Sequence, residues 1–191
     1  MGTASEPRRG GVAHGVPGLR KDHTRTGLGA TICGCGARCR RADGDVIRAG
    51  LSADLDFSRA GRSENARRIA EVAVLLADAG IVAIVALVSR YAADRQRARL
   101  RAVGHDPPIP FLEVYVDAPP EVREARDVRG LYTRARAREI ANFTGLTGDY
   151  EPPTNPDAHL HTDRKTPEEC VDVVIALLHP GARSVSGNPR P

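Results

Sequence analysis

The chain has 191 residues, enough for one α/β domain with a single hydrophobic core and too few for two ordinary domains. Its formal net charge of +4 comes mainly from arginines scattered along predicted helices, which suits a pocket for a polyanionic nucleotide and argues against a nucleic-acid partner. Because no apolar run is long enough to span a bilayer and no apolar segment follows the N-terminal charges, we expect a cytoplasmic protein with no membrane partner.

The two ends of the chain carry no periodic pattern. Residues 1–16 are rich in Gly, Arg and Ser, and residues 180–191 have a similar composition. We therefore expect disordered tails on either side of one domain that spans 17–179.

Three of the four cysteines, Cys33, Cys35 and Cys39, crowd into one short segment, and the fourth is Cys170. A thiolate metal site is the sharper hypothesis for this cluster. However, its Cys-x-Cys-x-x-x-Cys spacing lacks the Cys-x-x-Cys pairs that are usual in closed zinc sites. We therefore predict free thiols and no metal site.

Helix and strand signals alternate from residue 62 onward. Apolar residues at helical spacing predict a helix over 62–79 that ends at Gly80. The unbroken β-branched run over 81–88 is typical of a central parallel strand that is covered on both faces. A polar helix over 91–103 and a strand over 111–117 repeat this order.

The remainder of the chain continues the alternation. We expect helices over 121–126 and 131–140, a long loop over 142–156, a short strand over 158–162 and a helix over 167–178 that is capped by Thr166. A loop of that length in a compact domain is usually functional, often a lid. The pattern predicts an α/β three-layer fold with a mostly parallel sheet and right-handed crossovers.

The motif Asp43-Gly44-Asp45-x-x-Arg48 lies where a strand is expected to pass into a helix. Ligands of open α/β sheets collect at the carboxyl ends of strands, so two carboxylates and an arginine there suit Mg²⁺ and an anionic substrate. The same letters also suit a turn that caps a helix. The motif alone leaves both interpretations open.

Further motifs follow at characteristic spacing between Ala42 and Glu169. They are Leu55-x-Phe57-Ser58, Arg62, Glu64-Asn65, Gly130-Leu131-Tyr132-Thr133-Arg134-Ala135-Arg136 and Asn142-Phe143-Thr144-Gly145. With the Asp-Gly-Asp motif, this series resembles the adenylylsulfate kinase (APS kinase) family. The resemblance implies a P-loop-kinase-like fold that uses ATP and Mg²⁺ to phosphorylate the 3′-hydroxyl of adenylylsulfate, giving 3′-phosphoadenylylsulfate in sulfate assimilation.

The same resemblance implies roles for individual residues. Arg48, Arg62 and Asn65 would hold the phosphosulfate and ribose side of adenylylsulfate, because arginine forks suit such oxyanions. Phe57 would stack on one face of the adenine, and Phe143 would close the other face from the lid. For Phe57 the alternative is a core aromatic.

Four other positions complete the predicted site. Asp45, together with Asp43, would assist the hydroxyl or Mg²⁺, and Arg134 would be the surviving cation at a place where the family commonly has two lysines. Ser89 aligns with a serine described in the family as a phosphoserine intermediate, although a serine that simply ends a strand is an equal alternative. The chain departs from the family beside it, with Arg90 for a proline and Ala92 for an arginine.

The Gly-x-x-x-x-Gly-Lys-[Ser/Thr] loop that an ATP-dependent member needs is absent before Asp43. Lys21 has the position of the loop lysine, but its neighbour Asp22 would repel phosphate. Codons for residues 15–25, read one base later, permit Gly-Phe-Pro-Gly-Ser-Gly-Lys-Thr-Thr-Leu-Ala, a complete phosphate loop. We infer two compensating frame slips that make 17–41 an aberrant segment, disrupt the first strand and loop, and leave Lys21 as a cofactor ligand only in the restored frame.

Two further possibilities come with the resemblance. A catalytically dead regulatory domain could keep the adenylylsulfate pocket and lack ATP binding, which would also account for the missing loop. The quaternary expectations are a homodimer or an association with ATP sulfurylase.

Overall fold

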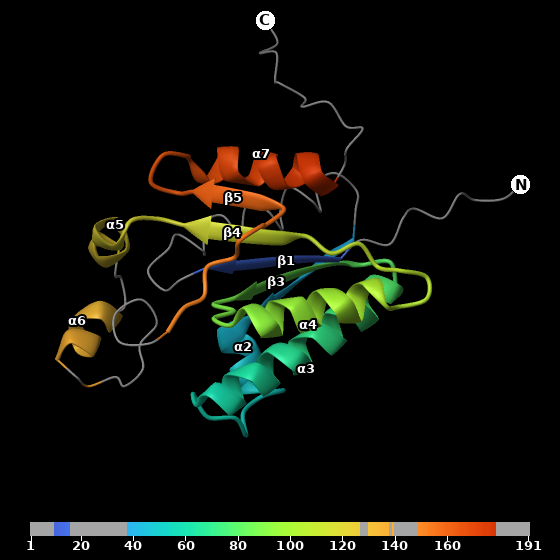
Figure 1. The fold of residues 1–191 in the computed structure, drawn as a ribbon, viewed down its shortest axis with the longest axis horizontal. Helices are drawn as coiled ribbons and strands as arrows, with labels where there is room; N and C mark the ends of the chain where they lie inside the picture. Colours follow the sequence, from blue (N-terminus) through green and yellow to red (C-terminus); the bar gives the residue numbers. More distant parts are fainter. Residues whose placement is uncertain (1–9, 16–37, 127–129, 138, 140–148, 179–191) are drawn as a thin grey trace, which may run out of the picture.

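A computed structural model of the chain describes residues 10–15, 38–126, 130–137, 139 and 149–178. Its centre is a sheet of five parallel strands in the order β2-β3-β1-β4-β5 (Figure 1). The strands are β1 (Gly10–Gly15), β2 (Cys39–Asp43), β3 (Val82–Leu87), β4 (Glu113–Asp117) and β5 (Ala158–His161). The predicted α/β fold class with a parallel sheet is confirmed.

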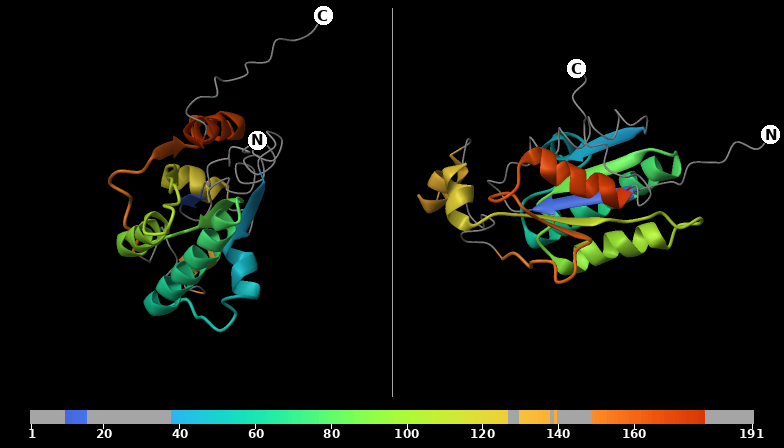
Figure 2. Two further views of the ribbon diagram at one scale, coloured as in Figure 1. Left: turned by 90° about the vertical axis from the view of Figure 1, so that its right-hand side faces the viewer. Right: turned by 90° about the horizontal axis from the view of Figure 1, so that it is seen from above.

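Helices cover both faces of this sheet. They are α2 (Gly44–Ala49), α3 (Arg59–Asp78), α4 (Ala92–Val103), α5 (Pro120–Ala125), α6 (Leu131–Arg136) and α7 (Pro167–Leu178). The pair α3 and α4 packs on one face and α7 on the other, while α5 and α6 lie beyond the carboxyl ends of the strands (Figures 1 and 2). In the described part of the chain, no helix combines the length and the apolar character that crossing a membrane requires.

The core follows from the alternation of side chains along each strand. Val114 and Val116 of β4 and Leu160 of β5 are buried against Cys170 and Val174 of α7. A second cluster on the other face joins Ala42, Ile69 and Val85. Residues of β4 and β5 that alternate with the α7-facing set therefore point toward the α3 and α4 side.

Local signals explain where the helices begin and end. The Ser58 hydroxyl accepts a hydrogen bond from the backbone N–H of Gly61 at 3.0 Å, so α3 begins earlier than the apolar pattern predicted. Gly80 follows the C-terminal end of α3, and its φ of +76° lies in the left-handed region that glycine adopts at helix ends. Thr166 and Glu169 form the reciprocal bonds of a capping box at α7, as predicted.

The N-terminal part of the chain differs from the expectation. Residues Gly10–Gly15 were expected within a disordered tail, but they form β1, which pairs with both β3 and β4 in the centre of the sheet. Likewise, Cys39–Arg41, expected within the aberrant segment, pair with β3. A strand between two partners is held by backbone hydrogen bonds on both edges, so it tolerates a composition that gives little side-chain signal.

The cysteine prediction is wrong at one position. Cys39 is disulfide-bonded, whereas Cys170 is a free thiol on the buried face of α7. Cys33 and Cys35 lie outside the described residues, as does the predicted tail over 180–191.

The buried Arg95 of α4 joins three segments of the chain. Its Nε lies 2.8 Å from Glu113 Oε1, and its two terminal nitrogens donate to the carbonyls of Ser89 at 2.8 Å and Glu151 at 2.7 Å. Only 4% of this side chain is exposed. Removing one partner of such a buried pair leaves an uncompensated charge and orphaned carbonyls.

We therefore expect Arg95→Met to lower the free energy of unfolding by about 3 kcal/mol in urea denaturation. The matched control is Arg97→Met on the same helix, where an exposed arginine pairs with Asp94 at 3.3 Å and the expected loss is below about 1 kcal/mol. Equal small losses in both variants would contradict a structural role for Arg95.

Candidate active site

The carboxyl ends of the parallel strands carry the Asp-Gly-Asp motif. Asp43 is the last residue of β2 and the N-cap of α2, where its Oδ1 accepts the backbone N–H of Asp45 at 3.0 Å. The interpretation of this motif as a helix cap is therefore confirmed. Capping does not exclude a binding role, because the motif lies at the edge of the sheet where ligands of open α/β folds bind.

Two predicted arginines lie against the predicted aromatic ring. The guanidinium carbon of Arg48 is 4.3 Å from the centroid of the Phe57 ring, and that of Arg62 is 5.2 Å away. Arg48 donates to the carbonyls of Leu55 and Asp56, and Arg62 donates to the carbonyl of Phe57 at 2.8 Å. Phe57 is 63% exposed, so it is not the core aromatic that was the alternative. Its ring remains accessible to a planar ligand.

The electrostatics of this cluster favour an anion. Burial, together with the positive charges of Arg90 and Arg48, lowers the pKa of Arg62 to about 10. Burial also lowers the pKa of Arg48, against the opposing effect of Asp56 and Asp45. Within the described ranges, no carboxylate pairs with Arg62. A bound oxyanion would supply the missing negative charge.

Asn65 adds an unpartnered polar atom to the same helix face. It lies one turn after Arg62 on α3, where residues three positions apart are neighbours. Its side chain is buried, and its Oδ1 has no hydrogen-bond partner among the residues that the structure describes. A buried amide oxygen without a partner is costly, so this atom suits a donor such as a hydroxyl of a ligand.

Ser89 follows β3 at the carboxyl edge, as predicted, but its backbone is unusual. Its φ of +42° lies in the left-handed region that residues other than glycine rarely adopt. The bond from Arg95 to its carbonyl holds this conformation. Strained backbone of this kind clusters at functional sites. The bond from Arg95 gives Ser89 a structural role, and a chemical role for its hydroxyl stays a prediction.

Arg90 also contributes positive charge to this site, although the sequence predicted it only as a departure from the family pattern. It is 5% exposed, its Nε donates to the carbonyl of Asp149 at 2.8 Å, and its own carbonyl accepts the N–H of Glu151 at 2.9 Å. Its charge acts on Arg62, so it adds a third arginine to the cationic cluster. Its position directly after the buried strand and Ser89 was the signal that could have revealed it.

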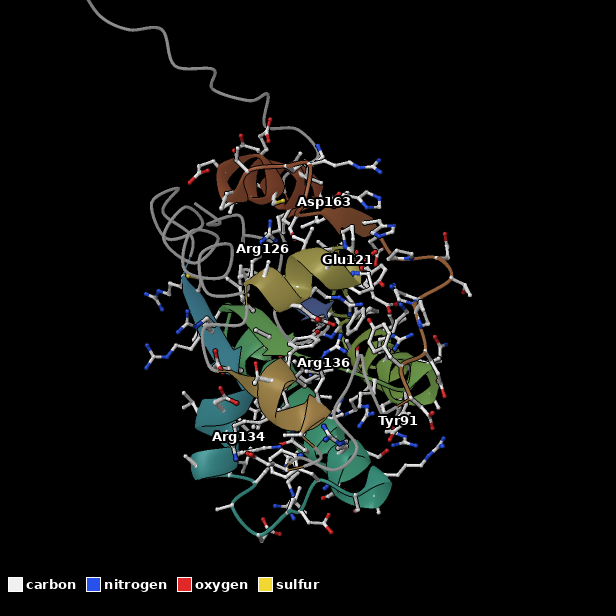
Figure 3. All side chains as sticks on the ribbon, turned by 90° about the vertical axis from the view of Figure 1, so that its left-hand side faces the viewer. Tyr91, Glu121, Arg126, Arg134, Arg136 and Asp163 are labelled. Atoms are coloured by element: carbon white, nitrogen blue, oxygen red, sulfur yellow. The ribbon has the colours of Figure 1, made fainter. Side chains whose placement is uncertain are left out.

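Helix α6 brings Arg134 to the same edge of the sheet. Figure 3 looks onto this edge, with Arg134 and Arg136 on α6 in front of the strands and Tyr91 at the start of α4. The Arg134 guanidinium pairs with Glu139 at 3.0 Å and is more than half exposed. The structure therefore places Arg134 near the predicted site but does not join it to the cluster around Phe57.

A separate hollow of about 310 Å³ lies between the end of α5, the end of β5 and the start of α7. Arg126 is fixed there by bonds from its two terminal nitrogens to the hydroxyl and carbonyl of Thr162, at 3.2 and 2.9 Å. Asp163, Arg164 and Lys165 line the same hollow. Figure 3 labels two of the lining residues, Arg126 and Asp163. The sequence analysis did not predict this hollow, because its walls come from segments far apart in the chain.

Two predicted site residues, Lys21 and Phe143, lie outside the described residues. The structure thus brings together Arg48, Phe57, Arg62 and Asn65 on α2, α3 and the segment between them. Asp43 and Asp45 lie where β2 passes into α2, Ser89 follows β3, and Arg134 lies on α6.

Several known proteins are related to this chain in sequence. An "Adenylyl-sulfate kinase" of Saccharomyces cerevisiae is 46% identical over 138 residues, covering 72% of this chain and 67% of that protein. One of Clostridium acetobutylicum is 42% identical over 164 residues, covering 86% and 80%. The "Bifunctional enzyme CysN/CysC" of Xylella fastidiosa is 48% identical over 136 residues, and the chain spans 21% of its length.

Solved structures agree with the fold. The structure of the Mycobacterium tuberculosis APS kinase CysC in complex with AMPPNP and APS matches with a TM-score of 0.84 and 39% identity, over 91% of this chain and 99% of that one. A sugar kinase from Janibacter, at 18% identity and a TM-score of 0.61, shares the fold alone. The family model described as "Adenylylsulphate kinase" matches residues 14–161, and the chain belongs to this family.

Proposed function

We propose that this protein is an adenylylsulfate kinase, which transfers the γ-phosphate of ATP to the 3′-hydroxyl of adenylylsulfate in sulfate assimilation. The observation that carries the proposal is the exposed Phe57 ring with Arg48 and Arg62 beside it, together with the unpartnered amide oxygen of Asn65, one helical turn after Arg62. A flat aromatic face beside Arg62, which pairs with no carboxylate among the described residues, is complementary to a nucleotide that carries an oxyanion.

In this proposal the two ends of adenylylsulfate are held differently. Phe57 stacks on the adenine and Phe143 closes its other face, which restrains the base with little directional demand. Arg48 and Arg62 neutralise the phosphosulfate, with Arg90 adding to the positive potential. Asn65 accepts a hydrogen bond from the ribose. Family membership supports these assignments, and each remains a proposal for this chain.

We place the base of ATP in the hollow between α5 and α7. The fixed guanidinium of Arg126 offers a planar cation on which a purine can stack. A hollow of this volume is within the range of small-ligand pockets. The phosphates would then extend toward the end of β1, the strand that is followed by residue 16 and the segment containing Lys21.

The carboxylates at the start of α2 fit Mg²⁺, because Asp43 and Asp45 offer the hard oxygen ligands that this ion prefers, at the edge where phosphates would lie. When bound, Mg²⁺ neutralises charge on the transferring phosphate. We assign Asp45 as the group that accepts the proton of the 3′-hydroxyl and Arg134 as a cation that stabilises the transferring phosphoryl group.

The finer biological context is part of the same proposal. ATP as cosubstrate fits a cytoplasmic location. A homodimer or an association with ATP sulfurylase is the proposed assembly, and light scattering of the purified chain, alone and mixed with ATP sulfurylase, distinguishes the two.

Calorimetric titration with adenylylsulfate tests the pocket. We expect Phe57→Ala and Phe143→Ala each to weaken binding by about 1–3 kcal/mol, because each removes one stacking face. The matched control is Leu75→Ala, which truncates an equally exposed apolar side chain of α3 (67% exposed, against 63% for Phe57) and should bind as the unaltered chain does. Unchanged affinity in both Phe variants, with the fold intact by circular dichroism, would contradict the assigned pocket.

A further inference from the structure

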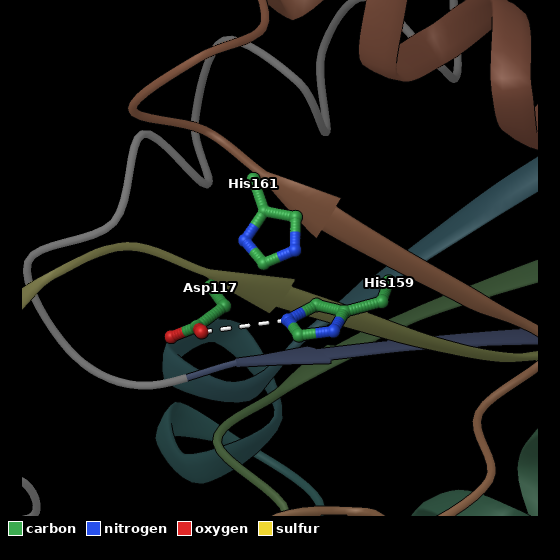
Figure 4. A group of neighbouring side chains, drawn as sticks. All are labelled: Asp117, His159 and His161. Atoms are coloured by element: carbon green, nitrogen blue, oxygen red, sulfur yellow. Dashed lines mark hydrogen bonds and ion pairs between the residues drawn. The ribbon is translucent and has the colours of Figure 1, made fainter.

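Three side chains of the types that ligate metal ions meet at the ends of β4 and β5, apart from the residues assigned above. One potential ligand atom from each of Asp117, His159 and His161 lies within 4.8 Å of the others (Figure 4). His159 Nε2 is 3.4 Å from Asp117 Oδ2, and the centroids of the two imidazole rings are 4.0 Å apart.

Strand register brings these residues together. Asp117 pairs with His161, and Tyr115 pairs with His159, in the parallel ladder of β4 and β5. Because side chains alternate along a strand, all four lie on the face opposite Val116 and Leu160, which are buried against α7. The two histidines and the carboxylate therefore share one surface that is open to solvent, with His159 the most exposed of the three.

We propose that Asp117, His159 and His161 form a binding site for a divalent transition-metal ion, of the class that includes Zn²⁺, Co²⁺ and Ni²⁺. Imidazole nitrogens select such ions over Mg²⁺, which prefers oxygen ligands. Two histidines and one carboxylate leave coordination positions for water, as in an open, exchangeable site.

The geometry is close to what such an ion requires. Two ligand atoms bound at about 2.1 Å to one tetrahedral ion stand about 3.4 Å apart. The distance from Asp117 Oδ2 to His159 Nε2 already has that value, and a ring nitrogen of His161 lies within 4.8 Å of the ligand atoms of the other two residues.

Surrounding groups hold the carboxylate in place. The backbone N–H of Ala118 donates to Asp117 Oδ1 at 2.9 Å, and the Asp117 carbonyl accepts bonds from the backbone and the hydroxyl of Thr162. The Tyr115 ring lies 4.6 Å from the His159 ring and limits its movement. Such outer contacts orient metal ligands, so a bound ion would tie β4 to β5 and stabilise the fold by mass action.

The test is titration of the full chain with Zn²⁺ and with Co²⁺, by calorimetry and by visible absorption. We expect the unaltered chain to bind Co²⁺ with nitrogen and oxygen ligation and no thiolate charge-transfer band, and to gain thermal stability with Zn²⁺. His159→Gln and His161→Gln should each weaken binding at least about tenfold, and the double variant should lose the site and the stabilisation.

The matched control is His105→Gln, since His105 lies 3.8 Å from the carboxylate of Asp78 but has no second imidazole beside it in the described structure. This variant should bind as the unaltered chain does. Asp117→Asn, which retains an acceptor for the Ala118 N–H, should weaken binding as the histidine variants do. Absence of binding by the unaltered chain, or equal binding by the double histidine variant, would overturn the proposal.

Discussion

Replacing Arg62 by alanine is expected to lower kcat/KM for adenylylsulfate by about 10²–10³, whereas Ser89→Ala should lose less than about tenfold. Phosphoryl transfer depends on positioning and on stabilisation of charge, and a covalent serine is optional. Arg62 lies against Phe57, and burial and neighbouring cations lower its pKa. A bound anion would therefore stabilise its charged form. Ser89 has a structural explanation instead, because its strained backbone is held by Arg95.

The comparison requires a chain in which the phosphate loop is restored, so that turnover is measurable. Arg67→Ala is the matched control. Arg67 lies on the same helix but forms an exposed ion pair with Glu64 at 2.7 Å, so this variant should keep its activity. Ser89→Gly adds a second control, because glycine relaxes the left-handed φ while removing the hydroxyl. Loss of activity in both Ser89 variants with retention in Arg62→Ala would refute the ranking and indicate a phosphoenzyme.

The sequence predicted most of the fold from periodicity alone. The run over 81–88 became β3, and the apolar spacing over 62–79 became α3, because a buried strand and a one-sided helix leave direct patterns in the letters. The strand β1 left no such pattern. Its place in the sheet depends on pairing with β3 and β4, which are distant in sequence, and not on its own composition.

The candidate site was predictable where it lies within one local stretch. Arg48, Phe57, Arg62 and Asn65 fall on α2, α3 and their connection, so their spacing also fixes their proximity. Arg90 and the group of Asp117, His159 and His161 were not predicted as sites. Strand register and packing bring these residues together from distant parts of the chain, and their spacing in the sequence does not predict that proximity.

The largest expected effect concerns the segment after β1. We expect the chain as written to have a kcat/KM at least about a hundredfold below that of a version carrying Gly-Phe-Pro-Gly-Ser-Gly-Lys-Thr-Thr-Leu-Ala at residues 15–25, because one phosphate-anchoring contact alone is worth that much. Gly15 ends β1 and pairs with Val116, so the loop would begin at the centre of the carboxyl edge. In the present sequence this stretch has neither the glycine-rich cradle nor a hydroxyl beside Lys21.

Because β1 is present, the restored loop should change turnover more than it changes the sheet, which corrects the expectation that the first strand is lost. Both versions would be expressed and assayed for conversion of adenylylsulfate with ATP and Mg²⁺, with adenylylsulfate binding as the control for an intact pocket. Restoration should raise turnover while leaving that binding within a few-fold, because the cluster of Arg48, Phe57, Arg62 and Asn65 lies on α2, α3 and the segment between them, and does not include the phosphate loop. Efficient turnover by the unaltered chain would overturn this account. Binding without turnover in either version would instead indicate a domain that recognises adenylylsulfate and has lost phosphoryl transfer for reasons beyond the loop.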